Sequence, residues 1–209
     1  MAKSVVGLFL NSAALFKVAL DAKELSATGA NQRDAVLTAI LFAAAAGEAF
    51  INEIGELAAS FRLESSSAEV DSMSALLDEA EQSNVSTVLK YHLAKLALTG
   101  EAFDKGSNPF QSFALLMDVR NSLMHMKIER LDAQDGNLVL KHPKVLGKLP
   151  QHMLAADDGA SVSGWITKIG TPAIAEWACK ATAAIVQDII GSLPSDLRKS
   201  IEVRYSQFY

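Results

Sequence analysis

The residue types best suited to chemistry in this 209-residue chain are Arg120, Asn121 and His125. On an α-helix Asn121 and His125, four residues apart, are neighbours on one face. Arg120 is five residues from His125, and its long side chain can curl toward the same place. Arginine grips a phosphate through two parallel hydrogen bonds, histidine moves protons near neutral pH, and asparagine can orient the imidazole. Together the three residues suit phosphodiester chemistry.

Three further polar residues are candidates to support this motif. Asp118 is seven residues before His125 and so is expected on the same helical face. Glu48 and Asn52 lie four apart on an earlier predicted helix. The favoured interpretation of that pair is a polar stripe that faces solvent or hydrogen-bonds across helices. The alternative is that Glu48 or Asn52 reaches Arg120 or His125.

The sequence predicts neither a metal nor a cofactor. Cys179 is the single cysteine, so no cysteine cluster can hold zinc and no intrachain disulfide can form. The H-E-x-x-H pattern, the Gly-rich phosphate loop with its lysine and the G-x-S-x-G elbow are all missing. The sequence therefore contains none of these recognisable metal or phosphate-loop motifs.

A lysine group near His142 has two interpretations. Lys141, Lys144 and Lys148 surround His142 in a segment interrupted by Pro143. These residues could contact an RNA backbone, or they could be a solvated loop, and the second interpretation is favoured. His142 itself is expected to be a solvated loop residue rather than a ligand.

The elements that must position these residues are mostly helices. Apolar residues recur at helical spacing over residues 4–25, 32–63, 72–82, 85–98, 109–127 and 172–190, and Pro194 opens a last short helix. Gly47 and Gly55 are expected to weaken the second helix locally. The expected fold is all-α, a single domain over 1–209, with an N-terminal helix at 4–25, a core at 31–127 and C-terminal helices at 161–209.

The pattern changes between residues 128 and 160. Short β-like runs at 128–131 and 138–140 flank Asp135-Gly136, which predicts a small hairpin after the motif helix. Asp157-Asp158-Gly159 is expected to form a surface turn. The bundle is therefore expected to carry a hairpin-bearing, otherwise irregular insertion.

Composition limits the class of protein. The chain has 19 Lys+Arg and 24 Asp+Glu, for a net charge of −5, and half of its residues are hydrophobic. This balance argues against a protein that coats nucleic acid non-specifically, although a local basic cleft remains compatible with it. The alanine-rich run at 35–50 is short for a bilayer span. We expect a cytoplasmic protein that does not enter a membrane.

At this point the chain resembles a known family. Arg120-Asn121-x3-His125 is similar to the Arg-x(4–6)-His motif of the HEPN superfamily, including the polar residue that often follows the arginine. The segment 43–54, in which Glu48 and Asn52 interrupt an apolar face, also resembles the second long helix of some HEPN families. The resemblance covers about residues 31–190 and implies a HEPN-like helical bundle.

The resemblance implies a specific activity. Many HEPN proteins with this motif are metal-independent RNA endonucleases of toxin–antitoxin or other defence systems, and they act as dimers with two motifs in one cleft. By that resemblance Arg120 would hold the phosphate, His125 would be the general acid or base, and Asn121 would support them. Lys127 stands where some HEPN toxins have a tyrosine that an antitoxin modifies, so that form of control is not expected.

Two functions follow as hypotheses. The first is a HEPN-type ribonuclease, a homodimer whose interface includes Phe113, Met117 and Met124, with an antitoxin or operon partner. The second is a non-catalytic HEPN-like module that binds a nucleotide, RNA or a protein. The complete motif favours the first, and the acidic net charge favours the second.

Overall fold

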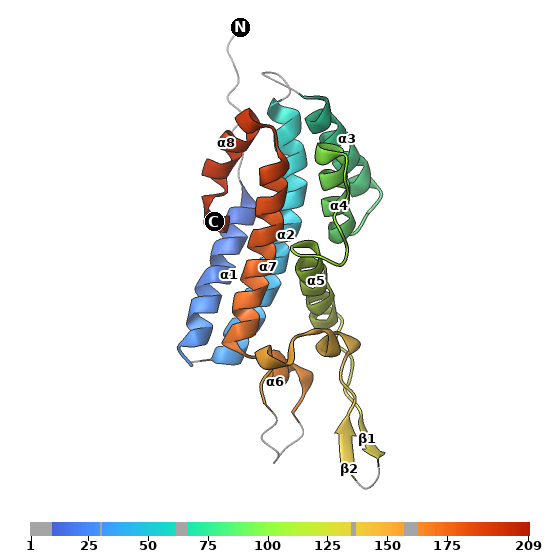
Figure 1. Cartoon of the computed structure of the whole chain (residues 1–209). Helices are drawn as coiled ribbons and strands as arrows, with labels where there is room; N and C mark the ends of the chain where they lie inside the picture. The colour runs from blue at the N-terminus through green and yellow to red at the C-terminus, as the bar shows by residue number, and fades with distance from the viewer. Residues whose placement is uncertain (1–9, 30, 62–66, 135–136, 157–162) are drawn as a thin grey trace.

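The computed structural model describes residues 10–29, 31–61, 67–134, 137–156 and 163–209, and this part of the chain is mostly helical. It contains eight α-helices and one pair of short strands (Figure 1). The all-α character expected from the periodicity is therefore confirmed. The residues predicted to begin the first helix, 4–9, lie outside the described part, as does the predicted turn at 157–159.

The centre of the fold is α2 (Gln32–Phe61), which packs against both α1 (Asn11–Ala27) and α7 (Pro172–Ser192), and α7 lies in front of it in Figure 1. Small side chains allow this close packing, because Ala39, Ala43 and Ala46 are fully buried. Alanine also has the highest intrinsic helix propensity. α7 begins with a capping arrangement, in which Thr171 accepts a hydrogen bond from the backbone N–H of Ile174 and proline occupies the first turn.

By length and composition alone, α2 over Gln32–Ala58 could cross a membrane, and it is the one such helix among the described residues. A core helix of a water-soluble protein passes the same test. In this fold the apolar side chains Ile40, Ile51 and Ile54 of α2 are fully buried within the chain.

Two antiparallel helices cover the other side of α2. They are α3 (Ala68–Gln82) and α4 (Thr87–Thr99), and Ser67 and Ser86 cap their N-termini. α4 ends at Gly100, whose left-handed φ of 75° suits a residue without a Cβ. In Figure 1 these two short helices lie above the start of the motif helix.

The motif helix is α5 (Phe110–Met124). It was predicted to continue to Lys127, but it ends one turn earlier, and His125 is its C-cap with φ −117° and ψ 42°. Its buried residues Phe113, Leu116, Val119 and Leu123 pack toward the core. Because the buried face fixes the rotation of the helix, Arg120 and Asn121 are left facing outward.

The strands β1 (Leu131–Gln134) and β2 (Asn137–Leu140) pair antiparallel, with Leu131 opposite Leu140 and Gln134 opposite Asn137. The first strand begins at Leu131, later than the run at 128–131 predicted. The predicted turn Asp135-Gly136 lies outside the described residues. This pair extends away from the end of α5 where His125 lies (Figure 1).

The remaining elements are short. They are the 3-10 helices η1 (Lys144–Lys148), η2 (Gln151–Met153) and η3 (Ser206–Phe208), and the α-helices α6 (Trp165–Ile169) and α8 (Ser195–Arg204). α6 was not predicted. It carries Trp165, which is 2% exposed and lines a cavity together with residues that precede β1 and follow β2.

The last described residues close the core against the first helix. Phe208 stacks on Phe16 with ring centroids 4.2 Å apart, and Phe50 meets Tyr205 edge to face at 5.0 Å. The Tyr205 hydroxyl donates to Glu53 Oε2, and Glu53 Oε1 accepts from the backbone N–H groups of Asn11 and Ser12. Glu53 of α2 thus supplies the N-terminal cap that α1 lacks in its own sequence.

Candidate functional site

Arg120 is held in place by two neighbours. Its Nη2 donates to Glu48 Oε2 at 3.0 Å and its Nη1 donates to Asn121 Oδ1 at 3.0 Å. The Arg120 and Glu48 side chains are 31% and 40% exposed. An ion pair with that exposure adds at most about 1 kcal/mol to stability. The contact therefore orients the guanidinium more than it stabilises the fold, and it joins two of the residues that sequence reasoning grouped.

A polar cavity of about 330 Å³ surrounds Arg120 between α2, α4 and α5. Glu48, Glu81, Lys90 and Asn121 line it. The Lys90 side chain is only 8% exposed, and its Nζ contacts the Glu81 carboxylate and, at 2.9 Å, Asn52 Oδ1. Asn52 thus bonds to Lys90, which the sequence had not singled out.

His125 lines a different cavity. It is exposed at the end of α5, and the space beside it, about 220 Å³, is also lined by Ser122, Lys141, His142 and Trp165. Arg120 does not line this space. The five-residue separation rotates the two side chains about 140° apart on the helix. Within one chain the structure therefore sets the arginine and the histidine of the motif at two separate cavities.

His142 is not the solvated loop residue that the sequence suggested. Its side chain is 23% exposed, and its Nδ1 lies 2.9 Å from Glu129 Oε1. Glu129 also accepts the backbone N–H of Trp165 at 3.2 Å. Glu129 was not among the predicted functional residues, and for His142 the solvated-loop interpretation was favoured, because the predicted hairpin does not by itself show which side chains beyond its strands meet.

The remaining residues of the predicted group have other partners. Asp118 Oδ2 lies 2.8 Å from Lys148 Nζ, with side chains 52% and 59% exposed. Asp118 and Asn121 line a third and larger cavity of about 760 Å³ against Lys148 and Trp177. Asp118 therefore neighbours Asn121 but lines neither the Arg120 cavity nor the His125 cavity.

The apolar residues expected at a dimer interface divide into two groups. Phe113 is fully buried and Met117 is 6% exposed, so both belong to the core of the chain and the prediction for them was wrong. Met124 is 60% exposed, and its place at a dimer interface stays a prediction. Met126 and Ile128, which follow it, are 61% and 91% exposed. An apolar, exposed run thus adjoins His125.

The groups with strongly shifted pKa lie in the core rather than at these cavities. Burial raises the pKa of the Cys179 thiol to about 11. Burial also raises the pKa of Tyr91 and of Tyr205 well above the ordinary value for a phenol, and in Tyr205 the neighbouring Glu53 carboxylate adds to the effect. All three groups stay protonated at neutral pH. Among the described residues, no group of three or more His, Cys, Asp or Glu side chains is placed to hold a metal ion.

Comparison with known proteins identifies no relative. No model of a protein family matches the chain, no curated protein matches it, and no solved structure matches its fold.

Proposed function

We propose that this protein is a metal-independent RNA endonuclease of the HEPN type, with a HEPN-like bundle and a small hairpin insertion after the motif helix. The observation that carries the proposal is that the residues of α5 that pack in the core are different from the motif residues that line cavities. Leu116, Val119 and Leu123 fill the core, while Arg120 and His125 each line an open cavity. Neither motif side chain is needed to hold the helix in place.

The chemistry fits these side chains. RNA supplies its own nucleophile, the 2′-hydroxyl, so the protein needs to stabilise charge on the phosphate and to transfer protons. Arg120, oriented by Glu48 and Asn121, supplies the charge. His125 transfers a proton. We place this activity in the cytoplasm, in a toxin or defence system with an antitoxin or other operon partner.

A homodimer brings the two motif residues together in this proposal. In a two-fold dimer, Arg120 of one protomer faces His125 of the other, and each interface has two such composite sites. Exposed apolar side chains at Met124, Met126 and Ile128 support an interface beside His125. Burying such side chains is the ordinary driving force for association.

The first test is cleavage of RNA in the presence of EDTA. We expect the wild-type protein to cut RNA and to leave DNA of the same sequence intact, because DNA lacks the 2′-hydroxyl. His125→Ala and Arg120→Lys should both lose cleavage, the second because an ammonium cannot reproduce the planar two-pronged grip. His152→Ala, at an exposed position in η2, is the matched control and should cut normally.

Mixing the two inactive variants tests the shared site. Random exchange of Arg120→Lys and His125→Ala chains makes about half of the dimers mixed, and each mixed dimer has one composite site with both native residues. We expect about one quarter of the wild-type rate from this symmetry. If each site were built within one chain, the mixture would stay inactive.

A specific observation favours a second function. Arg120 is already paired with Glu48, and it lies at a different cavity from His125. A non-catalytic module that binds a nucleotide, RNA or a protein would not require Arg120 and His125 to lie at the same cavity. Tight binding of RNA without any cleavage, and with no loss of binding in His125→Ala, would favour this module over the ribonuclease.

A further inference from the structure

A second imidazole shares the cavity of His125. His142, just after β2, and His125, at the end of α5, both line the space of about 220 Å³ that Trp165 also lines. The two histidines come from elements on either side of the strand pair. A substrate phosphate in this cavity would therefore have an imidazole available on each of two walls.

Glu129 holds His142 in one orientation. The carboxylate is acceptor-only, so the contact of 2.9 Å between Oε1 and Nδ1 means that Nδ1 carries the proton. The backbone N–H of Trp165 binds the same carboxylate at 3.2 Å. A Cβ at Gly164 would come within 2.9 Å of Glu129 Oε2, so the glycine leaves room for this arrangement. The ring nitrogen left to accept a proton from substrate is Nε2.

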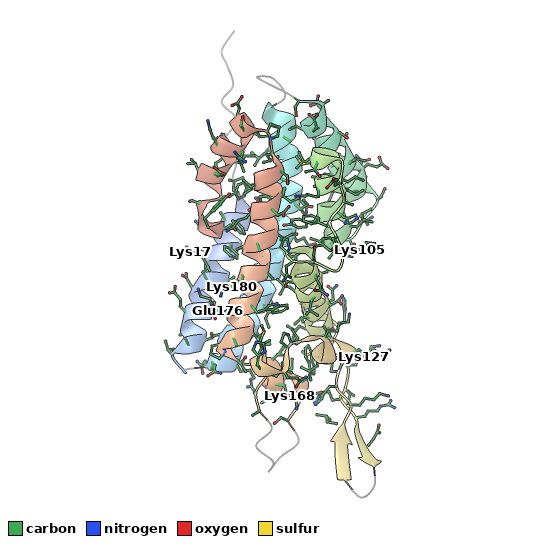
Figure 2. All side chains as sticks on the ribbon, viewed as in Figure 1. Lys17, Lys105, Lys127, Lys168, Glu176 and Lys180 are labelled. Carbon is green, nitrogen blue, oxygen red and sulfur yellow. The ribbon has the colours of Figure 1, made fainter. Side chains whose placement is uncertain are left out.

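The charges that line the cavity suit a phosphodiester. Lys127 and Lys141 line it, and Glu129, the one carboxylate among its lining residues, is occupied by His142 and Trp165. Figure 2 shows Lys127 beside the base of the strand pair, at the end of the molecule that also carries Lys168. Although the whole chain has a net charge of −5, this cavity has an excess of cations.

We propose that His142 is a catalytic residue, the general base of RNA cleavage, with His125 as the general acid and Glu129 as the positioning residue. This role rests on the ribonuclease function proposed above. His142 Nε2 takes the proton of the 2′-hydroxyl, and the 2′-oxygen forms a bond to phosphorus. The bond from phosphorus to the 5′-oxygen breaks, and His125 gives that oxygen a proton.

The products of this step are a 2′,3′-cyclic phosphate and a 5′-hydroxyl. The two histidines end with their protonation states exchanged, and proton exchange with water restores them. His142 rather than His125 is assigned as the base because the Glu129 carboxylate stabilises the imidazolium that forms when Nε2 of His142 gains a proton. Lys141 balances charge that develops on the phosphate.

The variant His142→Asn tests the role of the ring. The Asn amide N–H can replace Nδ1–H as the donor to Glu129, but the side chain has no group that can take a proton from substrate. We expect a rate loss of about 10²- to 10⁴-fold with an unchanged urea midpoint. His152→Asn makes the same substitution at an exposed site outside the cavity and should cut at the wild-type rate.

RNA with sulfur in place of the bridging 5′-oxygen separates the two roles. A thiolate leaves without protonation, so this substrate needs a general base and no general acid. We expect it to restore cleavage by His125→Ala and not by His142→Asn. Glu129→Gln keeps an acceptor for Nδ1–H of His142 but loses the negative charge, so we expect a smaller rate loss than for His142→Asn. Because both variants weaken the general base, both losses should persist on the sulfur substrate.

The outcomes divide cleanly. If the wild-type protein cuts no RNA, the ribonuclease and the role of His142 are both overturned. If His125→Ala is inactive while His142→Asn cuts normally, the ribonuclease stands and His142 is not catalytic. If the sulfur substrate restores both histidine variants, or restores His142→Asn alone, the assignment of base and acid is wrong.

Discussion

Replacing Gly47 by alanine is expected to destabilise the fold, although alanine is the better helix former. A Cβ at residue 47 of α2 would lie 2.6 Å from Cε2 and 2.9 Å from Cζ of Phe113 on α5. The Phe113 ring has little room to move, because it is fully buried and meets Tyr91 edge to face at 4.7 Å. Tyr91 in turn donates its hydroxyl hydrogen to Gly47 O at 2.8 Å.

Two opposing effects set the size of the change. Gly→Ala inside a helix stabilises by about 1 kcal/mol. Overpacking a well-filled core costs about 1 to 3 kcal/mol, and the fixed Phe113 ring puts this site near the upper end of that range. The net expectation for Gly47→Ala is a loss of about 2 kcal/mol in the free energy of unfolding, measured by urea denaturation.

Two further variants control this experiment. Gly191, near the end of α7, has no atom within 4 Å of a Cβ built on it, so Gly191→Ala should be neutral or slightly stabilising. Phe113→Leu makes space beside residue 47, so the double variant with Gly47→Ala should lose at least about 1 kcal/mol less than the sum of the single losses. If Gly47→Ala alone is as stable as wild type, the contact with Phe113 does not limit packing between α2 and α5.

Three other outcomes are expected. The pKa of Cys179 is raised from 9 to about 11, so the unfolded chain loses this proton first, and the free energy of unfolding should fall by about 2 kcal/mol as pH rises from 9 to 11. Urea denaturation of Cys179→Ala over the same pH range should lack that part of the fall. Glu53→Ala removes the acceptor for Asn11 N–H and for the Tyr205 hydroxyl, and should lower the free energy of unfolding by about 1 to 2 kcal/mol, read from the urea midpoint. Ile128→Lys places a charge on a side chain that is 91% exposed, so the chain should stay folded by circular dichroism while sedimentation reports weaker association of the proposed homodimer. Association equal to that of the wild type would place the proposed interface elsewhere.

Periodicity was sufficient to predict the long helices. α2, predicted over 32–63, is found over Gln32–Phe61, and α7 begins at Pro172 as predicted from Thr171-Pro172. These helices have continuous apolar faces and local capping residues, which are properties of neighbouring positions in the sequence. Their positions could therefore be predicted without knowledge of the fold.

The ends of elements and their mutual contacts were harder to predict. The last turn predicted for α5 is absent, although residues 125–127 are compatible with helix. Gly47 was interpreted as a weak point of α2, while in the structure it is the place where the Phe113 ring approaches the helix. That role depends on which residue of another helix lies opposite, so a pattern within α2 cannot reveal it.

The contacts of the candidate site could be predicted only in part, because they too depend on which residues of distant segments meet. The pairing of Glu48 with Arg120 was one of two interpretations left open, and the structure contains that contact. The contact of Glu129 with His142 was missed, because the two residues approach each other only after the chain reverses through β1 and β2. The sequence did contain one signal of this contact, because Glu129 and His142 lie at similar distances before and after the turn of the predicted hairpin.

The stacking of Phe208 on Phe16 also bears on how the protein is made. A ribosome releases α1 and α2 first, and the helix that fills the space beside them, α7, emerges only after the strand pair and α6. Contacts between residues this distant in sequence form late and slowly. The nascent chain therefore exposes the apolar faces of α1 and α2 until α7 has emerged, and it should engage chaperones. The cavity beside His125 is likewise incomplete until Trp165, which also lines it, has been synthesised.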